Sequence, residues 1–137
     1  MEHRLNTKGI GSFSNSELLH GEITKEIIGA AFEVHKILGY GFLERVYQRA
    51  LQTELLRRNI NSEIEHRITV RYKEIVVGDY TADLFVEEKI VVELKVSATY
   101  NSQDEAQLLN ELKATGMKVG LLINFGRAKV EFKRLVF

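Results

Sequence analysis

The stretch that decides the fold runs as Tyr80-Thr-Ala-Asp83-Leu-Phe-Val86, then a charged tripeptide at 87–89, then Ile90-Val-Val-Glu93-Leu-Lys95-Val96. The two outer runs are rich in Val, Ile, Thr and Tyr, which is typical of β-strands. Each run carries charge among apolar neighbours: Asp83 in the first, Glu93 and Lys95 in the second. A charge in an apolar strand is costly to bury unless it is paired. We therefore expect a β-hairpin whose charges serve a common site.

The length of the turn decides whether these charges meet. Directly opposite residues of an antiparallel pair project to the same face. A two-residue loop would place Asp83 opposite Val92, with Glu93 on the other face, because a one-residue slip flips every side chain. A three-residue loop at 87–89 places Asp83 opposite Glu93, and a bulge would do the same. In that register, period-two alternation puts Lys95 on the shared face as well.

The segments around this hairpin predict an α/β sandwich with a mixed central sheet flanked by helices. Apolar spacing predicts helices over 24–38, 43–58 and 101–115, with Thr24 as an N-cap and a capping box that begins at Ser102. Composition predicts strands over 63–66, 68–72, 76–86, 90–96, 118–125 and 129–136, with turns at 73–74 and 87–89. Residues 1–20 are expected to form a loosely ordered arm, and residues 21–137 a single domain.

Bulk composition bounds the class of protein. The chain has 137 residues, 19 basic and 19 acidic side chains, and a formal net charge of zero, so it lacks the globally basic character of many nucleic-acid binders. Cysteine is absent, which removes disulfides and thiolate metal sites. No apolar run approaches the roughly 18 residues of a membrane span, and the first residues show no apolar signal core. We expect a soluble, cytoplasmic protein without membrane contact.

Two carboxylates and a lysine on one face suit hydrolysis of a phosphodiester. Mg²⁺ takes oxygen ligands, often one or two protein carboxylates with water and phosphate oxygens, so Asp83 and Glu93 are the candidate ligands. The carbonyl of Leu94 is a further candidate ligand, and Lys95 a candidate cation for the charge that builds up on phosphate. The opposing interpretation is that Glu-x-Lys, which occurs four times here, is usually a solvated surface pair. The copy at Glu93 differs because it lies inside an apolar run.

Several ordered motifs resemble the GxxExxY protein family, which is grouped with the PD-(D/E)XK nuclease superfamily. The naming motif is present as Gly41-Phe-Leu-Glu44-Arg-Val-Tyr47. The other matching segments are residues 27–35, 80–83, 92–95, 106–110 and 119–126, and the resemblance runs from about residue 18 to the C-terminus. It implies a restriction-endonuclease-like fold. It also maps Asp83, Glu93 and Lys95 onto the superfamily's catalytic triple.

The same resemblance assigns roles to two helical residues. Glu44 corresponds to the superfamily's helical acid, and Gln107 to the glutamine of a Gln-x-x-x-Tyr motif. Residue 111, four after Gln107, is Glu rather than Tyr, which adds negative charge near a site expected to meet phosphate. Structural interpretations stand beside these roles: Glu44 also suits the helix dipole, Tyr47 suits the core, and His35 suits a buried, hydrogen-bonded position.

The sequence thus predicts a Mg²⁺- or Mn²⁺-dependent nuclease that hydrolyses nucleic acid, DNA more than RNA, through metal-activated water. The alternative is a catalytically silent nucleic-acid- or protein-binding module that keeps the nuclease fold. A homodimer is compatible with both hypotheses, because so small a chain leaves little room for a separate recognition domain.

Overall fold

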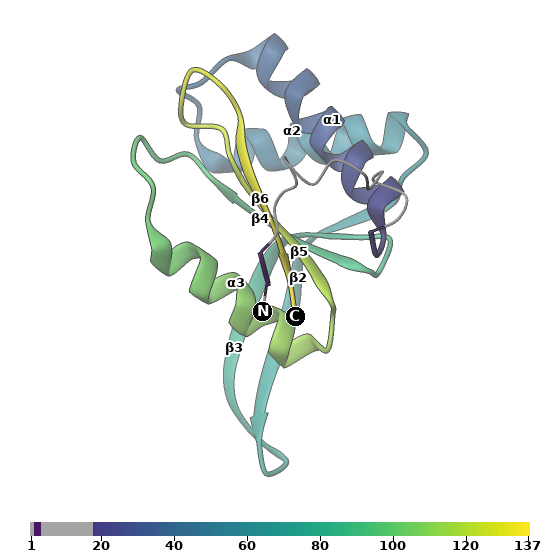
Figure 1. The fold of residues 1–137 in the computed structure, drawn as a ribbon, viewed down its shortest axis with the longest axis vertical. Coiled ribbons are helices and arrows are strands. Elements are labelled where there is room, and N and C mark those ends of the chain that lie inside the picture. Colours follow the sequence, from purple (N-terminus) through teal and green to yellow (C-terminus); the bar gives the residue numbers. More distant parts are fainter. Residues whose placement is uncertain (1, 4–17) are drawn as a thin grey trace.

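The computed structural model describes residues 2–3 and 18–137. Within them one mixed sheet has the strand order β1-β6-β5-β4-β3-β2 (Figure 1). The strands are β1 (Glu2–His3), β2 (Ser62–Tyr72), β3 (Ile75–Val86), β4 (Ile90–Lys95), β5 (Val119–Asn124) and β6 (Glu131–Val136). Only the β4–β5 pair is parallel among these strands, and α3 (Ser102–Thr115) makes that crossover. The expected α/β class with a mixed sheet is confirmed.

Helices cover both faces of the sheet. Helices α1 (Gly21–Leu38) and α2 (Glu44–Arg57) share one apolar cluster with the sheet, to which β4 contributes Ile90, Val92 and Leu94. Helix α3 covers the opposite face, to which β4 contributes Val91. Because side chains alternate along a strand, Glu93 and Lys95 belong to the face that α3 covers. No helix in the described part of the chain is long and apolar enough to cross a membrane.

The β3–β4 turn has the three-residue length on which the predicted site depends. Val86 pairs with Ile90 and Leu84 with Val92, so the register continues to Asp83 and Glu93. Residues 87 and 88 adopt φ of 54° and 55°, the left-handed conformation that closes the turn. The side chain of residue 87 also accepts a hydrogen bond of 2.8 Å from the amide of residue 61. The expected register is confirmed.

Strand β5 explains how α3 comes so close to the sheet. Its run is buried on both faces from Val119 to Ile123, as expected of a central strand. A Cβ added to Gly120 would lie 3.0 Å from the side chain of Leu108. Leu108 of α3 therefore packs directly on the backbone of Gly120, and no larger residue would allow this approach without a shift.

Local predictions failed mainly at helix starts. Helix α1 begins at Gly21, three residues before the expected N-cap, and the Thr24 hydroxyl donates instead to the Gly21 carbonyl at 3.1 Å. Helix α3 is capped by Asn101, whose side chain accepts from the Gln103 amide at 2.9 Å, rather than by Ser102. In both helices a polar residue inside the first turn resembled a cap in sequence. Which of these residues caps the helix depends on where the preceding loop enters it.

The remaining differences concern β2 and the N-terminal arm. The two predicted strands at 63–66 and 68–72 are one strand, β2, and the 73–74 turn is confirmed, with φ of 48° and 73°. Figure 1 shows the β2–β3 hairpin projecting beyond the helical layers. Of the predicted arm, residues 1 and 4–17 lie outside the described residues, while Glu2 and His3 pair with β6.

Candidate active site

The candidate site forms where β3 and β4 separate. One carboxylate oxygen of Asp83 accepts a hydrogen bond of 2.7 Å from the Leu94 amide. The backbone carbonyl of Asp83 accepts from the Gln48 side chain of α2 at 2.9 Å. The Asp83 side chain is thus bonded to the backbone of β4, and its backbone carbonyl is bonded to a side chain of α2. Asp83 is thereby fixed at the opening between two strands, one carboxylate oxygen already engaged.

A pair of buried glutamates lies beside Asp83. Glu93 is 6% exposed and Glu111 of α3 is fully buried. Burial, a hydrogen bond with Glu111 and the charge of Asp83 raise the pKa of Glu93 to about 11. Burial also raises the pKa of Glu111, while its hydrogen bonds with Glu93 and Gln107 oppose that rise. Both shifts favour protonation of this pair over two ionised carboxylates side by side.

Each member of this pair keeps one oxygen without a hydrogen-bond partner. These atoms are Oε2 of Glu93 and Oε1 of Glu111, both buried. A buried oxygen that lacks a partner is costly, and in native proteins such atoms often mark a missing water or ion. The orphaned oxygens are the strongest sign in this structure that the cluster exists to bind something.

Glu44 closes the cluster from the α2 side. It is the first residue of α2, and burial, the charge of Asp83 and a hydrogen bond with Asp83 raise its pKa to about 7. Tyr47 holds the turn that leads to it: the Tyr47 hydroxyl donates to the Gly39 carbonyl at 2.6 Å and accepts from the Phe42 amide at 3.3 Å. The tyrosine of the Gly-x-x-Glu-x-x-Tyr pattern thus fixes the turn that positions the glutamate.

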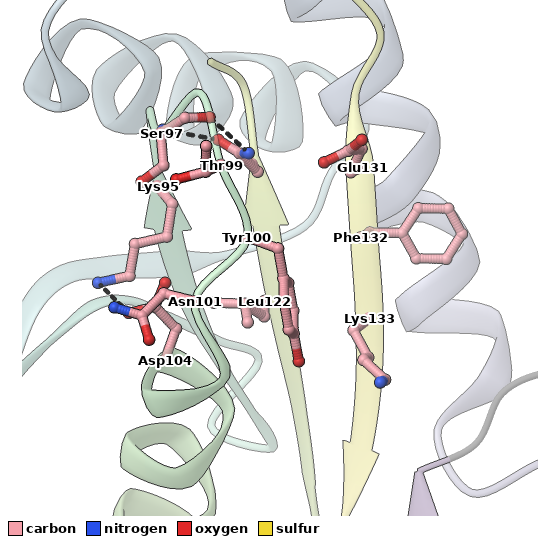
Figure 2. A pocket seen from close by; sticks show the side chains of 11 residues that line it. Lys95, Ser97, Thr99, Tyr100, Asn101, Asp104, Leu122, Glu131, Phe132 and Lys133 are labelled. Atoms are coloured by element: carbon pink, nitrogen blue, oxygen red, sulfur yellow. Dashed lines mark hydrogen bonds and ion pairs between the residues drawn. The ribbon is translucent and has the colours of Figure 1, made fainter. Parts of the chain in front are cut away.

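Lys95 lies at the edge of the acidic cluster. Its ammonium pairs with Asp104 of α3 at 3.5 Å (Figure 2). The positive charge also opposes the rise in the pKa of Glu44 and of Glu111, so the ammonium acts on the acids through space. In the conformation described, Lys95 contacts Asp104 rather than Asp83 or Glu93.

The other predicted residues reach the site indirectly. Gln107 is exposed, and its side chain donates to Oε2 of Glu111 at 3.3 Å. Leu94 meets the cluster through its amide, which Asp83 accepts. A ligand role for the Leu94 carbonyl stays a prediction.

Sequence reasoning missed two participants. Glu111 was treated only as extra charge near the site, yet it is buried against Glu93. Its spacing of four from Gln107 on one helix face was the available signal. Gln48, which holds the carbonyl of Asp83, had no such signal, because its partner lies 35 residues away.

His35 serves the fold and not the site. Its Nε2 is 2.9 Å from the Arg127 carbonyl, and its ring stacks on Phe125 at 6.2 Å. The structural interpretation of this histidine is therefore confirmed.

The donor set fits a hard divalent cation. All its free donors are carboxylate oxygens, which Mg²⁺ and Mn²⁺ prefer. Among residues 2–3 and 18–137, no three His, Cys, Asp or Glu side chains are spaced as a ready-made metal site. Mg²⁺ commonly takes only one or two protein carboxylates, so the pair Asp83 and Glu93 is sufficient in number. A bound cation would also neutralise charge on the Glu93–Glu111 pair and would give a partner to the buried oxygens that lack one.

Comparison with known proteins agrees with this architecture. A family model described as "PD-(D/E)XK nuclease superfamily" matches residues 21–135. A solved structure titled "Crystal structure of SSO0001" is similar, with a TM-score of 0.55 and 18% identity. The alignment covers 89% of this chain and 61% of that one. At this sequence identity the similarity shows a shared fold and nothing about function. No curated protein matches this chain.

Proposed function

Because this chain belongs to the PD-(D/E)XK nuclease superfamily, we propose that it is a Mg²⁺- or Mn²⁺-dependent hydrolase of nucleic-acid phosphodiesters, with DNA favoured over RNA. The observation that carries the proposal is the buried Glu93–Glu111 pair, with its orphaned oxygens, beside Asp83. A fold maintains such a costly cluster when the cluster has a ligand. The finer assignment to the GxxExxY family forms part of this proposal.

The proposed roles follow the chemistry of each group. Asp83, Glu93 and the Leu94 carbonyl would hold the cation, which would supply an acidified water and neutralise charge on the phosphate. Hydrolysis would form a bond from the water oxygen to phosphorus and break one phosphorus–oxygen ester bond. The attacking water would lose a proton to solvent, and the departing oxygen would take one up. Lys95 would move from Asp104 toward the phosphate, an exchange that a long, partly exposed ion pair of 3.5 Å permits.

Two further residues support the ligands in this proposal. Glu44 and Gln107 act as positioning residues at opposite sides of the cluster. Glu44 contacts Asp83 through a hydrogen bond, and Gln107 holds Glu111. Both therefore orient carboxylates whose mutual repulsion would otherwise spread them apart.

The primary test is cleavage by the purified chain. We expect single- or double-stranded DNA to be cut in Mg²⁺ or Mn²⁺ and to stay intact in chelator. Glu93→Gln should lower the rate on the order of 100-fold or more, as loss of a charge-stabilising group does. Glu88→Gln is the matched control, because Glu88 is exposed in the turn of the same hairpin. Absence of cleavage with either ion, or equal rates for both variants, would contradict the proposal.

The second candidate is a binding module that keeps the nuclease fold without its chemistry. The observation that favours it is the Lys95–Asp104 ion pair, which engages the ammonium outside the Asp83–Glu93 pair. Calorimetric titration with Mg²⁺ separates the two candidates. The hydrolase should bind the ion with an affinity that falls in both Asp83→Asn and Glu93→Gln. The silent module should show no titration that depends on these residues.

A further inference from the structure

A second feature adjoins the candidate site at Lys95. A cavity of about 120 Å³ opens there, and its walls come from the β4–α3 loop, β5 and β6 (Figure 2). The lining includes Lys95, Tyr100, Asn101, Leu122 and Lys133. Lys95 therefore belongs both to the candidate site and to the wall of this cavity. A ligand in the cavity would lie next to a phosphodiester bound at the acids.

The size of the cavity limits what it can hold. Its volume is many times the roughly 10–15 Å³ that one water molecule needs. It is also well below the roughly 300–1,000 Å³ of pockets that enclose drug-sized ligands. One planar ring system fits this range, and a larger portion of a nucleic acid does not.

The charges of the cavity favour an uncharged group. It contains two cations, and each is already engaged: Lys95 with Asp104 at 3.5 Å and Lys133 with Glu105 at 3.1 Å. Glu131 adds a further carboxylate to the wall. A phosphate would meet no uncompensated positive charge among these residues, whereas a neutral base would meet no penalty.

The walls offer a stacking surface and polar edges. The ring of Tyr100 is 63% exposed and stands between Lys95 and Lys133 (Figure 2). Asn101 gives its side-chain oxygen to the Gln103 amide at 2.9 Å, which leaves its NH₂ group to donate. Aromatic rings of this kind stack on bases of any sequence.

The loop that carries Tyr100 is anchored before any ligand arrives. The side chain of Asn124 accepts from the Ser97 amide at 3.0 Å and donates to the Ser97 carbonyl at 2.9 Å. A Cβ on Gly126 would lie 2.3 Å from the carbonyl carbon of Val96, so only glycine permits this approach. The Asn-Phe-Gly segment after β5 thus holds the start of the loop in place.

We infer that this cavity receives one unpaired base of single-stranded DNA, stacked on Tyr100, beside the phosphodiester that the acids hold. The inference rests on the proposed function, because it takes the position of that phosphodiester from it. A paired base inside a duplex presents no free face, and must leave the stack to enter a pocket of one ring's width. The substrate class of the site is therefore a single strand, a frayed end or a junction.

The test measures binding separately from cleavage. The parent protein is Glu93→Gln in Mg²⁺, and the probes are a short fluorescent single strand and a blunt duplex of equal length. Adding Tyr100→Ala should weaken binding of the single strand about 5- to 150-fold, the loss of one stacked base. Tyr100→Phe keeps the ring and should bind within about 2-fold of the parent, and binding of the duplex should not change with either substitution.

A matched control and two contrary outcomes complete the design. Tyr72→Ala removes a tyrosine of equal exposure, 62%, at the tip of the distant β2–β3 hairpin, and should leave both affinities unchanged. Equal losses for single strand and duplex in Tyr100→Ala, or no loss in either, would overturn the inference. So would a parent protein that binds no single strand. If the wild-type chain cleaves nothing but Tyr100 still controls binding, the proposed hydrolase fails and the base site stands.

Discussion

At the scale of single residues, the cluster is built from side chains that each restrain another. The Asp83 carboxylate accepts a hydrogen bond from the Leu94 amide, and the contact with Glu111 helps to raise the pKa of Glu93. The pKa values of Glu93 and Glu111 are both raised, because burial and neighbouring negative charge disfavour their ionised forms. Without a cation, the environment of Glu93 and Glu111 therefore favours their protonated forms.

The first residue-scale prediction concerns pH. Burial raises the pKa of Glu44 to about 7 from an ordinary value of 4.5. Between these two values the folded chain keeps a proton that the unfolded chain has lost, so stability falls as pH rises. Glu93, whose pKa lies higher still, extends the fall beyond pH 7. In chelator we expect a loss of about 4 kcal/mol from pH 5 to pH 8 through Glu93, about 1.4 kcal/mol for each of the three pH units. The added share of half-buried Glu44 is smaller, because solvent screens it.

Urea unfolding at the two pH values measures this loss. Glu93→Gln should flatten the dependence, since it removes the acid with the most strongly raised pKa, and Mg²⁺ should oppose the loss in the wild-type chain. Stability that rises from pH 5 to pH 8 in chelator would contradict the burial of these acids.

The second residue-scale prediction concerns the tyrosine that fixes the turn before α2. Tyr47→Phe keeps the ring, which stacks on Phe125 at 4.6 Å, but removes the hydroxyl bonded to the Gly39 carbonyl and the Phe42 amide. We expect a loss of about 1–3 kcal/mol in the free energy of unfolding. Cleavage should also slow, because Glu44 is less firmly positioned. Unchanged stability and rate would mean that the turn holds its shape without the hydroxyl.

At the scale of elements, the hairpin turn between β3 and β4 sets the register of the site. Its three residues bring Asp83 and Glu93 to one face, whereas a turn one residue shorter would direct Glu93 into the apolar layer under α1 and α2. The turn reaches this length with two glutamates in the left-handed conformation, which non-glycine residues adopt at a cost. At this turn the pairing of the two strands imposes a backbone conformation that glutamate does not prefer.

The element-scale prediction follows from that cost. Glu88 adopts φ of 55°, so Glu88→Gly should stabilise the chain by about 0.5–1 kcal/mol by relieving strain. Lys89→Gly, one position later and without a positive φ, is the matched control and should destabilise by a similar amount. Thermal unfolding of both variants checks the pair. Destabilisation by both would show that the turn gains more from the side chain of residue 88 than it loses in strain.

At the scale of the whole molecule, helices on both faces enclose the two central strands and leave one hairpin outside. Strands β4 and β5 are buried along nearly their whole length, whereas residues 71–77 at the tip of the β2–β3 hairpin are all exposed. Stability is therefore unevenly distributed over the sheet. The acids lie at the boundary between the enclosed strands and the part of β3 that leaves them.

The whole-molecule prediction is a gradient of hydrogen exchange. Amides of β4 and β5 should exchange only through global unfolding, and the amides at residues 71–77 should exchange fastest within the hairpin. Addition of Mg²⁺ should slow exchange most for residues next to Asp83 and Glu93, if these bind it. Uniform protection along β2 and β3 would contradict the view of the hairpin tip as an independent projection. Exchange measured by NMR or mass spectrometry resolves these segments.

The hairpin and the class of fold can be predicted from the sequence, whereas the length of the turn stays open there between two and three residues. These features depend on alternation of side chains and on residues close together in the chain, which a single sequence displays. It also indicated the acids at positions 44, 83 and 93. It misplaced the first turns of α1 and α3, because several neighbouring polar residues can cap a helix and the entering loop selects among them.

The surroundings of those acids follow from the packing of the helices on the sheet and could not be predicted from the sequence. The burial of Glu111 against Glu93, the turn of Lys95 to Asp104 and the bond from Gln48 to Asp83 all join residues on different elements. Such contacts depend on how α2 and α3 pack over the sheet, and no spacing along the chain encodes them. The raised pKa values follow from the same packing, because desolvation is a property of the enclosed volume and not of the residue.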